Sequence, residues 1–348
     1  MGPLTAVDLF AGAGGATRGL KDAGFDVIGA VELDTAAAGT YSLNHPEVHL
    51  WNDDVRTVTA TGMARDLSLR PGDLTLLKAC PPCQGFSSLT EGRVTAIDQK
   101  RNDLVLDTIR FVRALKPRFV MVENVPGLGR DVRFAALRAD LVKFGYVTRS
   151  YIVNATDFGV PQRRRRLIMI AGRGRRAVLP SSLEGSGHRP MTVRDAFDDL
   201  ADLGRDGDPL DVSRAPSRLT AERLAAIPVG GTRFDLPLAL QLDCHKAVDE
   251  RKRRVATGSY GRMKWSEPSP TMTTRCTTVA CGSFVHPDQD RGITLREAAT
   301  LQTFPHTYDF VGGYDQIERQ IGNAVPVRMV AAIASEIRIL ARRARVRA

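Results

Sequence analysis

The sequence predicts an α/β protein with a doubly wound, mostly parallel sheet and a smaller, irregular, β-rich part in its second half. Three observations lead to this prediction. Short apolar runs alternate with stretches of helical spacing up to about residue 172, the first run ends in a glycine turn (11-AGAGG-15), and loop-like sequence begins near residue 180. Strands that alternate with helices are typical of parallel sheets, because helices cross over between neighbouring strands.

The elements of the first half follow one another in a regular order. Apolar runs predict the strands, and apolar residues at helical spacing, ended by glycine or proline, predict the helices. The predicted strands span residues 5–10, 25–33, 50–55, 73–79, 118–125, 150–159 and 165–172, and the predicted helices span residues 16–24, 34–45 and 103–117.

The second half has less regular patterning. Residues 180–245 are rich in Pro, Gly, Asp and Arg, and residues 255–290 are rich in Thr, Ser and Gly, which is consistent with short β-strands. Residues 326–348 have the spacing of an amphipathic helix with a basic tail. We therefore expect an α/β domain, an irregular insertion and a terminal helix that returns to the first domain.

The charge of the chain favours polyanionic partners. The 348 residues carry a formal net charge of +10, and 8 of the 49 basic residues are lysines, so arginine dominates. Such a balance favours nucleic acid as a partner, although solvated surface arginines would give the same count.

The cysteines and the apolar runs exclude several classes of protein. Five irregularly spaced cysteines form no disulfide framework, which indicates a reducing compartment. No apolar run reaches about 20 residues and no secretory signal precedes 5-TAVDLF-10, so we expect a cytoplasmic protein that does not enter a membrane. The six scattered histidines and the lone CxxC pair, interrupted by two prolines, predict no metal site.

The glycine turn and two later carboxylates suggest an adenosine cofactor. Gly12, Gly14 and Gly15 lie between a strand and a helix, where backbone N–H groups can approach a ligand. Glu32 ends the second strand, twenty positions after Gly12, where a carboxylate can bind ribose hydroxyls, and Asp54 follows the third strand. A tight turn and a helix cap are the structural alternatives.

The stretch 79-ACPPCQGFSS-88 presents a thiol at the carboxyl end of a central strand. Ligands bind at this edge of open α/β sheets, so Cys83 is a candidate nucleophile, whereas Cys80 fits an inert buried thiol better. Glu123 ends the next strand and should lie at the same edge, as a cap or as a partner for a bound base. The basic run 162-QRRRR-166 precedes the last strand, and such runs are commonly solvated.

Taken in order, these segments resemble the bacterial DNA (cytosine-5)-methyltransferase family. The matching motifs are DLFAGAGG (8–15), PPCQGFS (81–87), ENV (123–125), QRRRR (162–166), REAATLQTFP (296–305) and GNAVP (322–326). The resemblance implies a Rossmann-like catalytic domain in residues 1–192, a target recognition domain in residues 193–319 and a C-terminal helix in residues 320–348.

The resemblance also implies how the catalytic residues act. Cys83 would add to C6 of a cytosine, so that C5 can accept a methyl group, and Glu123 would hold N3 and the exocyclic amine. Arg166 would contact the cytosine O2 and Arg164 would give local support. S-adenosyl-L-methionine is the implied donor. Its implied contacts are Phe10, Gly12, Gly14, Glu32, Leu33, Asp54, Val55, Pro82, Leu104 and Asn323.

Contacts with DNA are expected from two loops. A cytosine within a duplex must be extruded into such a site, and residues 84–102, with Ser87, Arg93 and Arg101, would close over it. In 258-GSYGRMKWSEPSPTMTT-274, Gly258 and Gly261 would allow a close approach to DNA, and Ser259 or Tyr260 would fill the gap left by the base. Arg262 is expected to read a guanine, with an ion pair to Glu267 or a phosphate contact as the alternative.

The expected partner is double-stranded DNA carrying a short specific sequence. An accompanying restriction endonuclease, a monomeric state and association with the nucleoid complete the expectation. The alternatives are an RNA cytosine-5 methyltransferase, because one branch of the family modifies tRNA, and an inactive DNA-binding paralogue. The complete set Cys83, Glu123 and Arg166 argues against the inactive paralogue.

Overall fold

A computed structural model describes residues 2–82, 103–174, 177, 179–181, 183, 189–202, 207–246 and 258–346. Its centre is a seven-stranded sheet with the order β3-β2-β1-β4-β5-β7-β6. The strands are β1 (Thr5–Leu9), β2 (Asp26–Val31), β3 (His49–Trp51), β4 (Leu76–Ala79), β5 (Phe119–Asn124), β6 (Tyr146–Asn154) and β7 (Arg165–Arg173). The first five strands are parallel, and β7 runs antiparallel to both β5 and β6.

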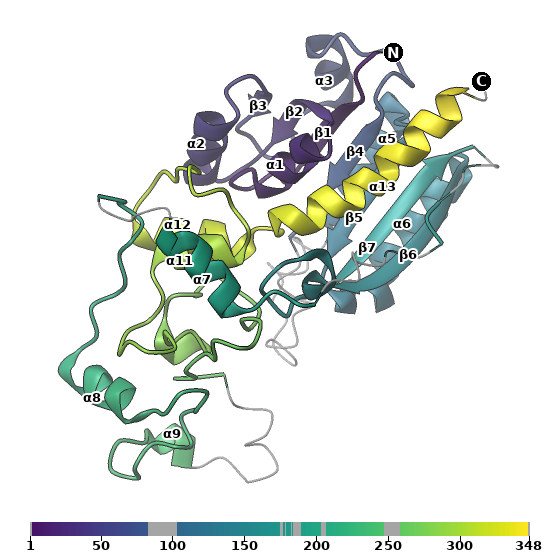
Figure 1. The fold of residues 1–348 in the computed structure, drawn as a ribbon. Helices are drawn as coiled ribbons and strands as arrows, with labels where there is room; N and C mark the ends of the chain where they lie inside the picture. Colours follow the sequence, from purple (N-terminus) through teal and green to yellow (C-terminus); the bar gives the residue numbers. More distant parts are fainter. Residues whose placement is uncertain are drawn as a thin grey trace.

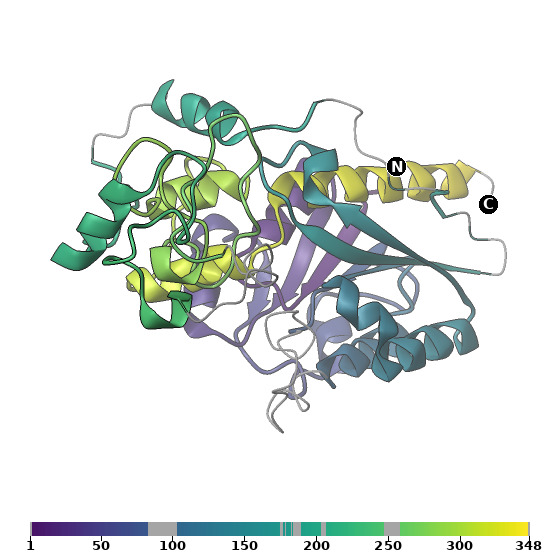
Figure 2. The ribbon, with the colours of Figure 1, turned by 90° about the horizontal axis from the view of Figure 1, so that it is seen from below.

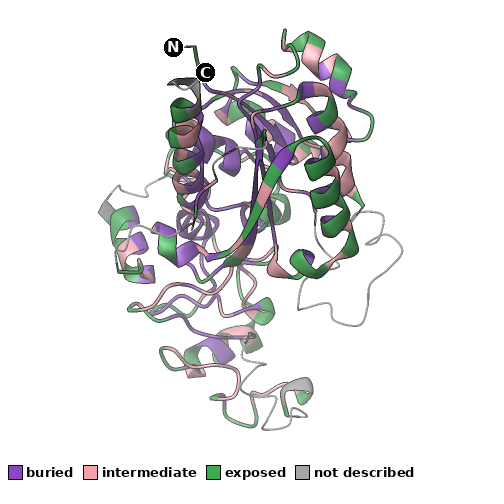
Figure 3. Cartoon of the chain, turned by 90° about the vertical axis from the view of Figure 1, so that its right-hand side faces the viewer, coloured by how far each residue is buried: buried purple, intermediate pink, exposed green. Residues whose placement is uncertain are grey.

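Helices cover both faces of this sheet. One face packs against α1 (Gly15–Asp22), α2 (Thr35–Asn44) and α13 (Val327–Val346), and the other packs against α3 (Ala60–Asp66), α5 (Leu104–Leu115) and α6 (Val132–Lys143). Figures 1 and 2 show the long α13 on one side of the sheet, with α5 and α6 on the other. In Figure 3 the central strands are largely buried, whereas the edge strand β6 is partly exposed and the flanking helices expose their outer faces.

Side-chain patterning explains why α1 and α13 occupy their face. Leu20 on α1 and Met329, Val330 and Ile333 on α13 are fully buried in one core cluster. Gly19 lies between them, and a Cβ there would lie 2.6 Å from the Val327 carbonyl oxygen. The predicted return of the terminal helix to the α/β domain is therefore confirmed.

The remaining described residues include an irregular segment, residues 189–313, which extends from one end of the sheet (Figure 1). Its helices are α7 (Val193–Asp202), α8 (Arg218–Ala226), α9 (Asp243–Lys246) and α11 (Leu295–Leu301), and α12 (Tyr314–Asn323) follows it. Among the described residues, the short 3-10 helices are η3 (Pro126–Arg130), η4 (Ala155–Phe158) and η5 (Val279–Cys281).

The doubly wound, mostly parallel sheet is confirmed, with two corrections. The predicted strand 150–159 ends at Asn154 and becomes η4, because Gly159 adopts a positive φ of 71° and closes a turn. The predicted β-rich character is wrong for the described residues 258–290, which contain isolated bridges and η5 rather than strands. Thr and Ser favour capping hydrogen bonds as readily as strands, which explains the error. Among the described residues, no helix is both long and apolar enough to cross a membrane.

Candidate active site

The carboxyl ends of β1, β2, β4 and β5 meet at one edge of the sheet, called the sheet edge below. The strand order changes direction between β1 and β4, where open α/β sheets bind ligands. Two backbone bonds tie the loops to neighbouring strands: Ala11 donates to the Val31 carbonyl (3.0 Å), and Cys80 donates to the Leu9 carbonyl (3.3 Å). The predicted residues that follow these strands are therefore neighbours.

The glycine turn after β1 has a conformation that suits close approach by a ligand. Gly12 and Gly14 have φ values of 57° and 89°, in the region that glycine tolerates, and a Cβ on Gly12 would meet no atom within 4 Å. Phe10, just before the turn, also has a positive φ of 60°, which costs a bulky residue free energy. This strained, open turn is the kind of backbone found at binding sites.

Glu32 closes the other side of the turn. Its Oε2 accepts a hydrogen bond from the Gly12 N–H (2.7 Å), and its Oε1 accepts one from the Asp34 N–H (2.8 Å). Burial raises the pKa of the Glu32 carboxyl, while these two backbone bonds oppose the rise. Leu33 follows with its side chain 64 % exposed. An open turn, a half-buried carboxylate and an exposed apolar side chain fit a nucleoside-containing group.

Asp54 and Val55 lie after β3, as the sequence predicted. The Asp54 carboxylate pairs with the Arg56 guanidinium, which lowers the pKa of that carboxyl. Val55 is buried in the core beneath it. In this structure Asp54 therefore acts first as a turn residue that also holds Arg56.

The loop after β4 is fixed by β5. The Asn124 side chain donates from Nδ2 to the Pro81 carbonyl (3.0 Å) and accepts at Oδ1 from the Val125 N–H (2.8 Å). Pro82 is half-buried, and the predicted nucleophile Cys83 lies outside the described residues. Asn124 thus holds the backbone from which Cys83 follows.

Glu123 carries the central carboxylate of the sheet edge. Its side chain is 3 % exposed, and its Oε1 lies 2.9 Å from the Arg166 Nε on β7. The Cys80 thiol donates a hydrogen bond to Oε2. The predicted Glu123 and Arg166 are therefore brought together, and Cys80, which was expected to be a buried thiol, is half-buried.

A second buried ion pair lies beside this carboxylate. The Lys78 ammonium on β4 lies 2.8 Å from Asp8 on β1, and both side chains are buried. Burial opposes the charged form of Lys78, but Asp8, Cys80 and Glu123 together raise the pKa of its ammonium. Thr17 donates to the other oxygen of Asp8. The two charges balance each other, so the pair places a buried ammonium and a buried carboxylate beneath the sheet edge without a net charge.

The 162-QRRRR-166 run divides its side chains between the interior and the surface. Arg164 is buried and donates to the carbonyls of Met272 (2.8 Å) and Ala324 (3.1 Å), which is the local support predicted for it. Gln162 is also buried and donates to the Gln302 side chain (2.9 Å). Arg163 pairs with Glu267, and Arg165 is exposed.

Comparison with protein families decides the reaction class. The family model described as C-5 cytosine-specific DNA methylase matches residues 4–338. The chain belongs to this family. It is a DNA cytosine-5 methyltransferase, as the motif order predicted.

Curated relatives extend over nearly the whole methylase. This chain is 34% identical to the Type II methylase M.HgiDII of Herpetosiphon aurantiacus, with 95% of this chain and 94% of the relative covered. It is 30% identical to the Type II methyltransferase M.AgeI of Thalassovita gelatinovora, with 97% and 99% covered. The catalytic and irregular parts therefore both have counterparts in these relatives.

Solved structures show the same architecture. An E. coli protein encoded within a prophage and described as a DNA modification methyltransferase is 25% identical, with a TM-score of 0.74 over 97% of this chain and 99% of that chain. The S. pombe Dnmt2 methyltransferase has a TM-score of 0.62 over 96% and 98% at 19% identity, which shows the fold alone.

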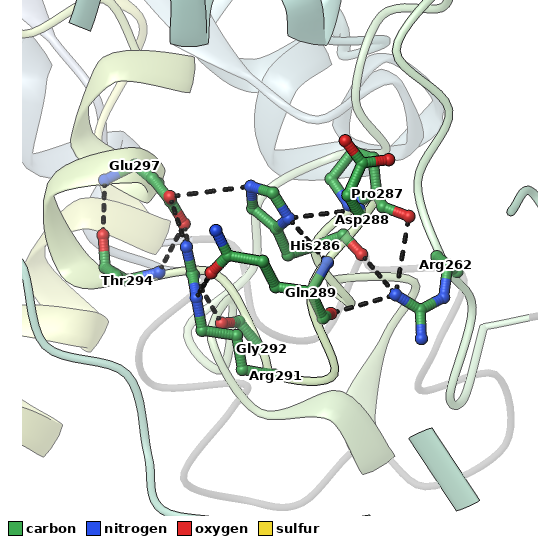
Figure 4. Close-up of polar contacts among 9 residues, drawn as sticks. All are labelled: Arg262, His286, Pro287, Asp288, Gln289, Arg291, Gly292, Thr294 and Glu297. Carbon is green, nitrogen blue, oxygen red and sulfur yellow. Dashed lines mark hydrogen bonds and ion pairs between the residues drawn. The ribbon is translucent and has the colours of Figure 1, made fainter. Parts of the chain in front are cut away.

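Arg262 is the clearest departure from the predicted site. Its side chain is 5 % exposed and pairs with Asp290 at 2.6 Å, whereas Glu267, the partner named in the alternative, pairs with Arg163 and Lys264. Its guanidinium also donates to backbone carbonyls, as Figure 4 shows in part; the acceptors are Leu224, Ile227, His286, Pro287 and Gln289. Every N–H of the guanidinium faces an acceptor within the protein, so the prediction that Arg262 reads a base is wrong, and so is its proposed phosphate contact.

The neighbours of Arg262 are also internal. Tyr260 is buried, adopts a φ of 56°, and donates from its N–H to the Val279 carbonyl (2.7 Å). A Cβ on Gly261 would collide with Ser283, so this glycine serves protein packing rather than an approach to DNA. Tyr260 is thus not placed to fill a gap in DNA, whereas Ser259 is half-buried and accepts from Arg233 Nη1 at 3.4 Å.

A cluster of polar side chains between residues 286 and 297 lies next to Arg262 (Figure 4). His286 accepts at Nδ1 from the N–H groups of Asp288 and Gln289, and its Nε2 faces Glu297 at 3.9 Å. Arg291 makes a bidentate pair with Glu297 at 2.8 Å for both bonds. Glu297 completes a capping box with Thr294 at the start of α11. The cluster fixes residues 286–292 of the irregular segment to the start of α11.

The remaining predicted residues are half-buried, exposed or outside the described residues. Leu104 begins α5, and Asn323 ends α12 with an exposed side chain. Ser87, Arg93 and Arg101 lie outside the described residues, as do residues 84–102 as a whole.

Sequence reasoning missed the residues that brace the glycine turn. Tyr308 donates to the Ala13 carbonyl (2.6 Å), and His45 Nε2 contacts the Gly14 carbonyl (3.2 Å) and the Tyr308 hydroxyl (3.1 Å). Tyr308 stands three residues after the REAATLQTFP motif, which was a usable signal. His45 ends α2 before Pro46, and nothing in the sequence marked it as a contact of the turn.

Proposed function

We propose that the methylase extrudes a cytosine from double-stranded DNA, within a short specific sequence, and adds Cys83 to its C6 atom. S-adenosyl-L-methionine would supply an electrophilic methyl group on its sulfonium. The observation that carries the proposal is the buried pair of Glu123 and Arg166 at the sheet edge, beside the backbone that leads to Cys83. A DNA duplex would meet a positively charged protein, in agreement with the net charge of +10.

The side chains would divide the chemistry as follows. Bond formation between the Cys83 sulfur and C6 would push electron density onto C5, so that C5 could form the new carbon–carbon bond while the bond between the methyl group and the sulfonium sulfur breaks and a neutral thioether leaves. Glu123 would bind the N3 edge and the exocyclic amine, stabilising the ring as its charge changes. Arg166 orients Glu123 and would contact O2. Loss of the C5 proton and cleavage of the Cys83–C6 bond then restore the aromatic ring and the thiol.

The glycine turn and its surroundings fit the donor. Gly12 and Gly14 would admit its methionine part, Glu32 would bind its ribose and Leu33 would pack on its adenine. The open space at Gly12 and the exposure of Leu33 support this assignment. Phe10, Asp54, Val55, Pro82, Leu104 and Asn323 complete the proposed set.

We also propose that different parts of the chain carry out catalysis and target recognition. Residues 1–192 and the terminal helix would carry catalysis, and residues 193–319 would recognise the target. With Arg262 and Tyr260 internal, Ser259 remains as the proposed contact in this part, with Ser87, Arg93 and Arg101 in the loop after Cys83. A monomer in the cytoplasm, associated with the nucleoid and accompanied by a restriction endonuclease, is the proposed setting.

Replacement of Cys83 tests the proposal. DNA from cells that express the wild-type protein, analysed by bisulfite sequencing, should show 5-methylcytosine in one sequence context, and DNA from cells with Cys83→Ser should show none. A duplex with that site and 5-fluorocytosine at the target should form a denaturant-stable complex with the wild type, because the fluorine blocks the final elimination.

The matched control is Cys281→Ser, which changes an exposed cysteine and should leave methylation intact. Full methylation by Cys83→Ser would refute the covalent mechanism. Methylation of RNA but not of DNA would favour the alternative of an RNA enzyme, and the absence of any wild-type activity would favour an inactive paralogue.

A further inference from the structure

The glycine turn after β1 is held by a tyrosine of the irregular segment. The Tyr308 hydroxyl donates to the Ala13 carbonyl (2.6 Å) and contacts His45 Nε2 (3.1 Å), which in turn contacts the Gly14 carbonyl (3.2 Å). Both rings are buried. A Cβ on Gly14 would lie 2.6 Å from the Tyr308 hydroxyl oxygen, so the two rings fit closely against the bare backbone of the turn.

Tyr308 is itself held in place independently of the turn. Arg296 Nη1 donates to the Tyr308 carbonyl (3.1 Å), and the Asn44 side chain exchanges two hydrogen bonds with the backbone of the next residue, Asp309. The Phe304 ring packs against the tyrosine ring, with the centroids 4.8 Å apart. Removal of the hydroxyl alone should therefore leave the ring in place and break only its polar contacts.

The open conformation of the turn depends on side chains that lie outside it. Gly12 and Gly14 both have a positive φ, and glycine loses more conformational freedom on ordering than any other residue. Glu32 holds the turn on one side, by accepting from the Gly12 N–H (2.7 Å), and Tyr308 holds it on the other side, at the Ala13 carbonyl. Loss of either contact would let the turn populate other conformations.

We propose that Tyr308 is a positioning residue for the methyl donor, whose hydroxyl holds the glycine turn in the conformation that binds S-adenosyl-L-methionine. This inference rests on the proposed placement of the donor at the turn. It gives the irregular segment a part in cofactor binding as well as in target recognition. A ligand that binds one conformation loses apparent affinity as that conformation becomes less populated.

The test compares two tyrosines that each donate from a buried hydroxyl to a backbone carbonyl. Tyr308→Phe removes the bond to Ala13, and Tyr146→Phe removes a bond to the Pro117 carbonyl (2.7 Å), at the amino ends of β5 and β6 on the opposite edge of the sheet. Calorimetry measures the dissociation constant of S-adenosyl-L-methionine. We expect Tyr308→Phe to raise it by about 2–10-fold, the effect of one hydrogen bond, and Tyr146→Phe to keep the wild-type value.

Steady-state kinetics with saturating DNA provide a second readout. Tyr308→Phe should raise the KM for the donor and keep kcat, because the turn has the same geometry once the donor is bound. A lower kcat with an unchanged KM would indicate a general structural role and overturn the inference. His45→Phe, which removes the Nε2 contact with the Tyr308 hydroxyl, is tested in the same way if Tyr308→Phe does not fold.

Leu33→Ala separates this inference from the proposed function, since Leu33 is exposed and would pack on the adenine of the donor. If the wild type does not bind the donor, or if Leu33→Ala binds it as the wild type does, the proposed placement of the donor fails. If Leu33→Ala weakens binding while Tyr308→Phe and Tyr146→Phe bind equally well, only the role of Tyr308 fails.

Discussion

At the sheet edge, Arg166 pairs with the carboxylate of Glu123, at the carboxyl end of β5. In the irregular segment, Arg262 is more deeply buried and donates mainly to backbone carbonyls. Both arginines follow short sequence patterns that suggested contact with a nucleic-acid base. The backbone around each arginine explains why Arg166 can contact a base and why Arg262 cannot.

Within the sheet, the strands satisfy each other's N–H and C=O groups through regular ladders. Side chains at the ends of the strands are therefore available for other partners. The described residues of the irregular segment form few ladders, so buried carbonyls need donors from side chains. A guanidinium with five donors satisfies several carbonyls at once, which commits Arg262 to the interior.

Replacement of Glu123 tests the sheet edge and should have the largest effect. Glu123→Gln keeps the shape of the side chain but removes the charge that pairs with Arg166 and would bind the cytosine. We expect the rate of methyl transfer to fall by about 10²–10⁴-fold. Arg165→Gln is the matched control on β7, where the side chain is exposed, and should keep the rate. Circular dichroism of both variants shows whether they fold, and a wild-type rate in Glu123→Gln would remove it from the chemistry.

Replacement of Arg262 tests the irregular segment and should change stability rather than specificity. Arg262→Met keeps the apolar stem but leaves buried carbonyls without donors, which we expect to lower the free energy of unfolding by about 3–5 kcal/mol. Arg275→Met, at an exposed arginine of the same segment, should change it by less than about 0.5 kcal/mol. Urea denaturation measures both. Unchanged stability together with lost discrimination at one base pair would restore the base-reading role.

The two regions also differ in how much the sequence could predict. The seven strands, the helices α1, α2 and α5 and the returning α13 were predicted from hydrophobic periodicity, because each element buries one face against the same sheet, whereas α3 and α6 were not predicted. Periodicity carried little information between residues 180 and 290, and there the expected strands were replaced by turns and bridges. Short polar side chains in this stretch support several backbone conformations, and tertiary contacts choose among them.

The candidate site follows the same division. Glu32, Glu123 and Arg166 could be placed because the carboxyl ends of parallel strands share one edge. The contact between Cys80 and Glu123 depends on the side-chain direction at one residue after β4, which strand prediction does not give. The Tyr308 bond to the glycine turn joins residues 295 positions apart, and no local pattern encodes such a pairing.

His45 lies where the two regions meet and provides the smallest of the expected effects. Its Nδ1 contacts the Lys21 ammonium (2.9 Å), while its Nε2 contacts the Gly14 carbonyl and the Tyr308 hydroxyl. A lysine donates to Nδ1 when that nitrogen is unprotonated, so this geometry requires the neutral ring, with its hydrogen on Nε2. Burial, followed by the positive charge of Lys21, lowers the pKa of His45 to about 4.

The lowered pKa predicts how stability depends on pH. As the pH falls from about 6.5 to about 4, the unfolded chain takes up a proton that folded His45 resists. The contribution of His45 is therefore present above pH 6.5 and declines by about 3 kcal/mol across this window. His45→Gln removes the titrating group, so the difference in unfolding free energy between wild type and variant should narrow by this amount as the pH falls. His49→Gln, at an exposed position, is the control. Parallel pH curves for the wild type and His45→Gln would show that the glycine turn does not depend on a neutral His45.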